Sequence, residues 1–419
     1  MKARIRQYIL WCARRKITNT KAKIVAITGS VGKSSTKEAV TSALSQKYRV
    51  RSNYGSLNNE LGLPLAILGE RNASSPLGWL WKVIKITLRT FIFDPKVEIM
   101  VLECGIDKPG DMDSILKLIT PDISIITTVE DAHLENFANH ESLVHEKWKL
   151  AFGTKKSGTI IVNLDNPPTH TQIHHVDARV ITFGLNQKAD YSAQDIEYNQ
   201  KGTTYTLVAE SEKRSISVPT IGKIQAYVTL PAIITGRVLG ESWAEITAGL
   251  EKLIPLPGRL SLLEGIKGCY LLESSYNASP SSMKAAIEVL KNIPGKRHIA
   301  IVGDMRELGN ITPEAHLEML TILAKECDIV CTFGPNYESA LSHLPAHTKA
   351  QAAFHHFQSR EDIVAFITPK LQKEDIVLIK GSQNTITLEK VSVKLMAHPE
   401  MAKQVLPRQY GKWKYTDRE

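Results

Sequence analysis

Hydrophobic residues follow two patterns in the first half of the chain. Short apolar runs, each as long as a strand buried on both faces of a sheet, occur at 24–27, 97–102, 123–129 and 159–163. Segments that can form helices lie between them, including 37–46 and 141–150. Because strand and helix patterns alternate, the sequence predicts an α/β fold built around a mostly parallel sheet.

The pattern changes between residues 190 and 218. Residues 203–209 alternate between polar and apolar side chains, directly after a turn-like segment at 199–202. Such alternation is typical of a strand with one solvated face, so we expect an antiparallel subsheet here. A pair of helices is expected to follow before Leu253.

Proline and glycine are concentrated at 254–259, and the alternation of strands and helices then starts again. Clusters of these residues interrupt regular structure and are common between domains. We therefore expect one domain at 23–256 and another at 257–419. A helix at 1–22 is expected to precede both.

Two basic segments with large apolar residues lie outside this alternation. Residues 1–22 contain an apolar run that is too short for a secretory signal, and arginines follow it. Residues 76–93 carry Lys82, Lys85 and Arg89 at helical spacing, which is too much charge for a membrane-spanning helix. Each segment could contact a membrane peripherally. We favour packing on the first domain, because most amphipathic helices face a protein core.

Composition limits the class of protein. The chain has 419 residues, of which 43% are hydrophobic and 23% charged, so it is globular and long enough for two or three domains. Its net charge of +9 suits nucleotides, but would equally suit a nucleic acid or an anionic membrane. The five cysteines are scattered and form no zinc-binding pattern, which favours reduced thiols in a cytoplasmic protein.

Residues 24–36 combine a strand, a glycine-bounded turn and a hydroxyl-rich helix start. The turn and helix start consist of Thr28, Gly29, Ser30, Val31, Gly32, Lys33, Ser34 and Ser35. Backbone N–H groups at such a helix start bind phosphate, Lys33 would neutralise phosphate charge, and Ser34 could bind Mg²⁺. Ile27 replaces the first glycine of the full phosphate-loop pattern. The alternative is an ordinary turn with an exposed lysine.

Three further residues carry candidate chemistry. Glu103 ends an apolar strand, so its carboxylate is expected at the same sheet edge as the phosphate loop, where it could bind Mg²⁺. His133 follows the strand at 123–129, and Lys147 lies in the helical run at 141–150. Taken singly, this histidine is typical of a surface or capping residue and this lysine of a solvated helix face.

In order and spacing, these residues resemble the motifs of the Mur ligase family, ATP-dependent enzymes that add amino acids or dipeptides to peptidoglycan precursors. Residues 28–34 are similar to the family's phosphate loop, and 132–134 with 146–149 are similar to its His-Leu motif and downstream lysine. Further motifs resemble those of members that add D-alanyl-D-alanine, and they lie at 58–64, 257–260, 275–280, 302–309 and 380–382.

The resemblance implies a central domain of the P-loop ATPase type and a Rossmann-like α/β C-terminal domain. It implies that Ser34 and Glu103 hold one Mg²⁺ on the phosphates of ATP, while His133 and a carbamylated Lys147 hold a second. Lys33, His133 and Lys147 are the implied catalytic residues. The other implied contacts are Arg259 and Asn277 with the nucleotide, and Asn58, Asn59, Asp304, Glu307 and Lys380 with the substrates.

The implied reaction forms an amide through an acyl phosphate. A carboxylate of the precursor attacks the γ-phosphate of ATP, and D-alanyl-D-alanine or another amine then displaces the phosphate. We expect small-molecule substrates, a monomer, a cytoplasmic location and no nucleic acid partner. The phosphate loop begins after about two dozen residues, so the family's N-terminal UDP-binding domain is expected to be missing. A ligase of the folylpolyglutamate synthase type and a non-catalytic ATP-binding regulatory protein are the alternatives.

Overall fold

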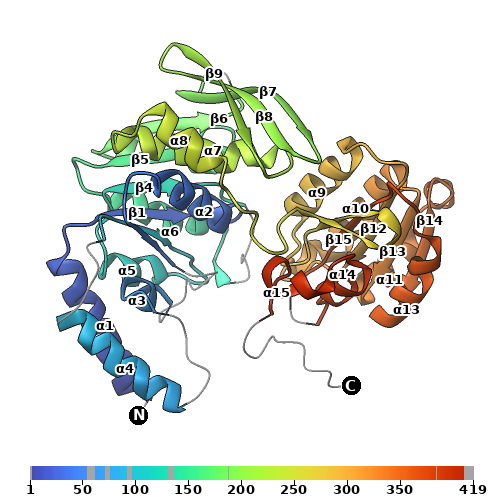
Figure 1. The fold of residues 1–419 in the computed structure, drawn as a ribbon, viewed down its shortest axis with the longest axis horizontal. Helices are drawn as coiled ribbons and strands as arrows, with labels where there is room; N and C mark the ends of the chain where they lie inside the picture. The colour runs from blue at the N-terminus through green and yellow to red at the C-terminus, as the bar shows by residue number, and fades with distance from the viewer. Residues whose placement is uncertain are drawn as a thin grey trace. The chain divides into compact units, whose positions relative to one another are not determined.

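The computed structural model describes residues 2–53, 62–70, 76–91, 97–130, 136–186, 188–383 and 385–409. The chain divides into two compact units (Figure 1). The first contains residues 1–196, 205–217 and 226–253, and the second contains 197–204, 218–225 and 254–419. Two short segments from the middle of the sequence therefore group with the C-terminal unit.

The first sheet has the strand order β2-β3-β1-β4-β5-β6-β7-β8-β9 in the described residues. Its strands are β1 Lys23–Thr28, β2 Val50–Ser52, β3 Ile99–Glu103, β4 Ile123–Ile126, β5 Thr159–Asn163, β6 Arg179–Gly184, β7 Tyr191–Asn199, β8 Gly202–Ala209 and β9 Glu212–Val218. Pairing is parallel from β2 through to β7. The predicted mostly parallel sheet is confirmed.

Strands β7, β8 and β9 form the predicted antiparallel subsheet. Two-residue loops at 200–201 and 210–211 join them, and connections this short join antiparallel strands only. Glu210 and Ser211 have φ angles of 53° and 64°. Positive φ at both central residues is the backbone of a type I′ turn, whose twist matches that of the flanking strands.

Helices surround this sheet, and those of the first unit are α1 Lys2–Asn19, α2 Lys33–Leu44, α3 Gly62–Ile67, α4 Pro76–Phe91, α5 Asp111–Leu116, α6 His140–Phe152, α7 Ile224–Val238 and α8 Trp243–Leu250. The predicted helix pair before Leu253 is thus present. Helix α2 begins four residues earlier than expected, directly after Gly32. Helix α6 begins at His140 because the Asn139 side chain accepts a hydrogen bond from Ser142 N in a capping box.

The two basic segments form helices α1 and α4, which pack together and on the first unit. Ile9, Cys12 and Ala13 of α1 and Ile86 of α4 are fully buried in the core. The Tyr8 hydroxyl also forms a hydrogen bond of 2.7 Å with Thr87 Oγ1. The favoured packed arrangement is therefore observed. Across the described part of the chain, no helix is long and apolar enough to cross a membrane.

The second unit contains a sheet with the order β10-β11-β15-β12-β13-β14 in the described residues. Its strands are β10 Ser261–Glu264, β11 Tyr270–Glu273, β12 His298–Gly303, β13 Ile329–Phe333, β14 Ala353–Phe357 and β15 Ile376–Lys380. Only β10 pairs antiparallel among them. The helices are α9 Pro280–Asn292, α10 Thr312–Glu326, α11 Pro335–His343, α12 Ala346–Lys349, α13 Arg360–Ile367, α14 Glu389–Leu395 and α15 Ala402–Val405.

Helices cover both faces of this second sheet (Figure 1). One core joins the sheet to α9, α10 and α11, through residues such as Met283, Met319 and Tyr337. The other joins it to α13 and α14, through residues such as Ile363 and Val391. A parallel sheet with helices on both faces is the expected Rossmann-like fold, in which ligands bind at the carboxyl ends of the strands.

Candidate active site

The phosphate loop connects the end of β1 to the start of α2 and depends on two glycines. Gly29 and Gly32 have φ angles of 146° and 87°, which favour glycine. A Cβ atom on Gly29 would lie only 2.1 Å from Thr127 Oγ1. Thr127 Oγ1 donates a hydrogen bond of 2.6 Å to Val31 O, and Ser30 N donates one of 2.6 Å to Thr128 O. These contacts also explain why β4 ends at Ile126 rather than at 129.

Lys33 folds back over its own loop. Its Nζ donates hydrogen bonds to Gly29 O at 2.7 Å and Ser30 O at 3.0 Å. The ammonium group therefore lies beside the backbone at the N-terminus of α2, where anions are stabilised by N–H groups and by the helix dipole.

Ser34 and Glu103 meet at the carboxyl edge of the sheet. The register places Ile27 of β1 opposite Glu103 of β3, and Ser34 Oγ donates a hydrogen bond of 3.0 Å to Glu103 Oε1. Glu103 is buried, and its Oε2 has no hydrogen-bond partner among the described residues. Because a buried carboxylate oxygen normally has a partner, this atom and the adjacent hydroxyl fit a divalent cation.

Lys147 of α6 points at the same loop. The side chain is only 2% exposed, and its Nζ lies 3.2 Å from Gly29 O, the carbonyl that also accepts from Lys33. Burial and the nearby charge of Lys33 lower the pKa of Lys147 well below its ordinary value, while Asp107 and Glu146 oppose that shift. Lys147 is therefore not the solvated helix lysine that its sequence context favours.

The described residues include only part of the predicted set. His133, Asn58 and Asn59 lie outside them. Of the predicted metal ligands, Ser34, Glu103 and Lys147 converge around the phosphate loop. Within the described ranges, no group of three or more His, Cys, Asp or Glu residues could hold a metal ion. A cation here would therefore depend on a serine hydroxyl or on a modified lysine in addition to Glu103.

In the second unit, Lys380 lies at the carboxyl edge of the sheet. It is 3% exposed, and its Nζ donates to Asn277 O at 2.8 Å and Ser274 Oγ at 3.2 Å. Burial and the positive charge of Arg259 lower the pKa of Lys380 to about 7. The guanidinium of Arg259 stacks on the Tyr276 ring, 4.5 Å from its centroid.

The other predicted residues of this edge have different surroundings. The two carboxylate oxygens of Asp304 accept hydrogen bonds from Tyr337 N at 3.0 Å and Asn336 N at 3.1 Å, so they cap the first turn of α11. Glu307 and Asn277 are exposed. Asp304 thus has a structural role within the unit, and Asn277 contacts Lys380 through its backbone carbonyl only.

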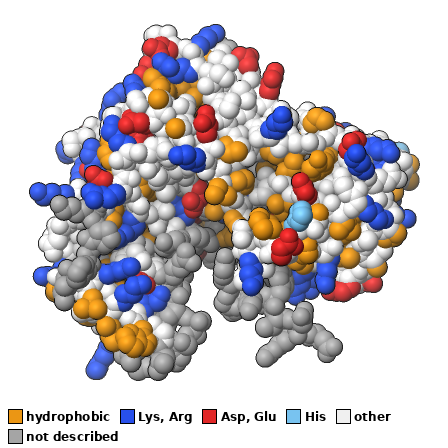
Figure 2. Space-filling model, in the orientation of Figure 1, with side chains coloured by type: hydrophobic (Ala, Val, Ile, Leu, Met, Phe, Trp, Pro, Cys, Tyr) orange, Lys and Arg blue, Asp and Glu red, His pale blue; other side chains and the backbone are white. Residues whose placement is uncertain are grey.

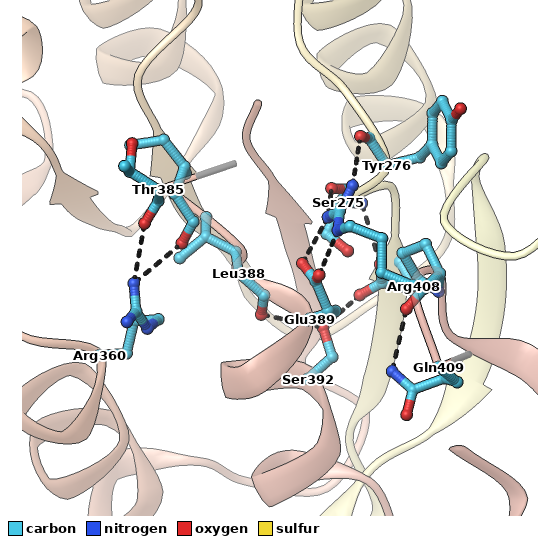
Figure 3. Close-up of polar contacts among 12 residues, drawn as sticks. Ser275, Tyr276, Arg360, Thr385, Leu388, Glu389, Ser392, Arg408 and Gln409 are labelled. Atoms are coloured by element: carbon cyan, nitrogen blue, oxygen red, sulfur yellow. Dashed lines mark hydrogen bonds and ion pairs between the residues drawn. The ribbon is translucent and has the colours of Figure 1, made fainter. Parts of the chain in front are cut away.

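The loop that carries Ser274 and Asn277 is held by the C-terminal segment (Figure 3). Arg408 forms a buried ion pair with Glu389 of α14. It also donates to Ser275 O at 2.7 Å and Tyr276 O at 2.8 Å. Arg408 therefore fixes the backbone that supplies the acceptors of Lys380.

Several residues at both edges escaped sequence analysis. Asn53 Oδ1 accepts from Glu103 N at 2.9 Å, and Asn53 O accepts from Lys37 Nζ at 2.6 Å. Asn53 directly follows β2, so its place after a strand was a usable signal. Thr127 and Ser274 carried no comparable signal, because their contacts join segments far apart in the sequence.

Comparison with known proteins agrees with this architecture. A model of the Mur ligase middle domain matches residues 27–236, and a model of the Mur ligase glutamate ligase domain matches residues 258–383. The chain belongs to the Mur ligase family. The predicted family and fold class are thereby confirmed.

Individual relatives are more specific. The chain is 27% identical over 383 residues to UDP-N-acetylmuramoyl-tripeptide--D-alanyl-D-alanine ligase of Bacillus subtilis, covering 90% of this chain and 76% of that protein. It is 30% identical over 383 residues to the Rickettsia prowazekii enzyme of the same name, with 90% and 78% coverage. The MurF ligase of Thermotoga maritima, solved in complex with ADP, superposes with a TM-score of 0.77 at 26% identity, covering 92% of this chain and 82% of that one.

Proposed function

We propose that this chain is an ATP-dependent ligase that forms an amide through an acyl phosphate, adding D-alanyl-D-alanine to a UDP-N-acetylmuramoyl-tripeptide. The observation that carries the proposal is the convergence of Lys33, Lys147 and the Ser34–Glu103 pair around one phosphate loop. The names of the relatives supply the substrates. A phosphate loop alone would suit many nucleotide-binding proteins, whereas the second buried lysine suits a site that neutralises two anionic reactants.

The phosphate loop would bind the triphosphate of ATP. Lys33 already lies over the loop, 2.7 Å from Gly29 O, so it needs only a side-chain rotation to reach a phosphate oxygen. The N–H groups at the start of α2 would bind further phosphate oxygens. In this reaction the protein contributes positioning and charge neutralisation rather than a covalent intermediate.

Ser34 and Glu103 would hold one Mg²⁺, and His133 with a carbamylated Lys147 would hold a second. Such ions neutralise phosphate charge and orient the reacting oxygens. The unpartnered Glu103 Oε2 is the atom that supports the first site. Glu103 itself is kept in place by Asn53, which accepts from its backbone N–H.

Carbamylation of Lys147 is chemically reasonable in this environment. The neutral amine attacks CO₂, a C–N bond forms, and the nitrogen loses a proton, leaving a carbamate with one negative charge. Burial and Lys33 lower the pKa of Lys147, so the reactive neutral amine is favoured. The product would also replace repulsion between two ammonium groups at Gly29 O with attraction between Lys33 and an anion.

The C-terminal unit would complete the site. Arg259 and Asn277 are proposed to contact the nucleotide. Lys380 is proposed to contact a substrate together with Glu307, Asn58 and Asn59. Asp304 would act indirectly by capping α11. We also propose that the enzyme is a cytoplasmic monomer.

The test is phosphate release with purified chain, ATP and Mg²⁺. Release that requires both UDP-N-acetylmuramoyl-tripeptide and D-alanyl-D-alanine, with the amide product seen by mass spectrometry, supports the proposal. Release with a folate and glutamate would instead support a folylpolyglutamate synthase type of ligase. ATP binding without release with any substrate pair would support a regulatory protein.

A further inference from the structure

Helices α1 and α4 expose large hydrophobic side chains although both are packed on the first unit. On α4, the exposed residues follow helical spacing, so they form one stripe. Trp11 of α1 extends this stripe, since its ring centroid is 5.7 Å from that of Phe91. We call this surface the α1/α4 patch; it consists of Trp11, Trp81, Ile84, Leu88 and Phe91, which are 43–68% exposed. In Figure 2 the region of α1 and α4 shows hydrophobic side chains next to Lys and Arg side chains.

The patch is separate from the face that stabilises the fold. The inward face of the pair consists of fully buried residues, including Ile9, Cys12 and Ile86. The Tyr8–Thr87 hydrogen bond of 2.7 Å ties the two helices together. The exposed tryptophans and leucine therefore do not complete the core, and contiguous apolar residues of this kind usually mark an interaction surface.

Charge is distributed unevenly around the patch. Helices α1 and α4 together contain nine Lys and Arg residues and no Asp or Glu. This excess equals the net charge of the whole chain, +9. The remaining 43 basic residues are thus balanced by all 43 acidic residues. The positive charge of this protein is a property of one helix pair.

The basic side chains lie next to the hydrophobic ones. The guanidinium of Arg15 is 4.9 Å from the centroid of the Phe91 ring and 5.9 Å from that of Trp11. Glu70 forms ion pairs with Lys82 at 3.6 Å, Lys85 at 3.2 Å and Arg89 at 2.8 Å. One carboxylate thus faces three cations of α4, which leaves an excess of positive charge.

Crowding of cations continues on α1. The pKa of Lys16 is lowered to about 8 by burial and by the charges of Arg51 and Arg89. An anionic surface would relieve this repulsion.

We propose that the α1/α4 patch docks on an anionic lipid membrane, with both helices lying in the plane of the interface. Charge complementarity selects this occupant. A nucleic acid would match the cations but has no use for a stripe of Trp, Ile, Leu and Phe, whereas a second copy of the chain would bring nine like charges against nine. Tryptophan and phenylalanine beside Lys and Arg are typical of helices that bind membrane surfaces. This inference does not depend on the proposed ligase activity.

The experiment is vesicle flotation of the full chain. Vesicles of equal parts phosphatidylglycerol and phosphatidylcholine are compared with pure phosphatidylcholine at about 0.1 M and about 1 M salt, since salt screens the attraction. We expect the wild type to float with the anionic vesicles at low salt only. Equal flotation with both vesicles, or none with the anionic ones, would overturn the proposal.

Variants test the two components of the patch separately. Trp81→Glu with Leu88→Glu removes the apolar stripe, and Arg4→Gln with Arg14→Gln removes two cations of α1. Each pair should reduce binding roughly tenfold or more. Met401→Glu is the matched control, because Met401 is a comparably exposed hydrophobic residue of the second unit; its binding should equal that of the wild type.

Two further measurements keep the result specific. Thermal unfolding and phosphate release without vesicles should match the wild type in every variant, which separates this proposal from the ligase assignment. Size-exclusion chromatography over a range of concentrations tests a dimer. A dimer that Trp81→Glu with Leu88→Glu abolishes would overturn membrane docking in favour of a second copy.

Discussion

Lys147 in the first unit and Lys380 in the second are both buried, and both donate to a backbone carbonyl beside a sheet edge. Their environments differ. Lys147 shares its acceptor, Gly29 O, with another cation, Lys33. Lys380 has a hydroxyl and a carbonyl as acceptors, and the carboxylate of Glu273 partly offsets its loss of pKa. The first lysine is thus held as a neutral amine suited to modification, and the second is able to gain and lose its proton near neutral pH.

The largest expected effect comes from removing the cation that distinguishes the two regions. Lys33→Ala should reduce ATP-dependent phosphate release by roughly 100-fold or more, because the γ-phosphate loses its neutralising charge. The measurement is steady-state phosphate release with both substrates. Lys23→Ala, an exposed lysine of β1, is the control. Turnover within about threefold of the wild type in Lys33→Ala would contradict the phosphate-loop assignment.

Lys147→Ala should be nearly as inactive. If a carbamate is the missing metal ligand, added acetate or formate should restore part of the activity, and depletion of CO₂ should lower that of the wild type. Lys149→Ala is a matched control on the same helix, since Lys149 pairs with Asp113 at 2.6 Å on the surface. Full activity in Lys147→Ala would show that this amine has no role in the reaction.

Lys380 should make stability depend on pH. The folded-state pKa of about 7 lies below the ordinary 10.5, so between these values the unfolded chain binds more protons. Stability conferred by this group therefore rises with pH from about 7 to 10, by at most about 1.4 kcal/mol per pH unit. Chemical unfolding of the wild type and of Lys380→Met at several pH values tests this. Parallel pH profiles for the two proteins would rule out a shifted Lys380.

The smallest effect is expected for Ser274→Ala. This change removes one acceptor of Lys380, at 3.2 Å, and leaves Asn277 O in place. A hydrogen bond of this kind contributes about 1 kcal/mol, so we expect a KM change of a few fold and a small loss of stability. Ser281→Ala in α9 is the control. A loss as large as that of Lys147→Ala would mean that Ser274 contacts a reactant directly.

Local sequence accounts for the elements that carry the phosphate loop. The apolar run at 24–27 is long enough for a buried strand, and the glycines with Lys33 and Ser34 mark the start of a helix at the sheet edge. Glu103 was also predictable, because it ends a strand. Its partner Ser34 depended on the β1–β3 register, which joins segments far apart in the chain.

Burial could not be predicted from the same patterns. In sequence, Lys147 looks like a solvated helix lysine, yet the packing of α6 beside the loop leaves it 2% exposed. The role of Asp304 was also decided by tertiary structure, because its hydrogen bonds go to the backbone of α11, thirty residues later in the chain. A side chain's solvation depends on which other elements cover it, and spacing along one element carries no such information.

Sequence by itself determined the charge of the N-terminal helix pair, since nine cations without an acidic residue can be read directly from 2–19 and 76–91. It also determined that both segments are helical, because their apolar residues recur at helical spacing. Only tertiary structure decided which face each helix exposes. Ile9, Cys12 and Ile86 were drawn into the core. Trp81 and Leu88 stayed in solvent, because a helix resting on one surface can bury only one side.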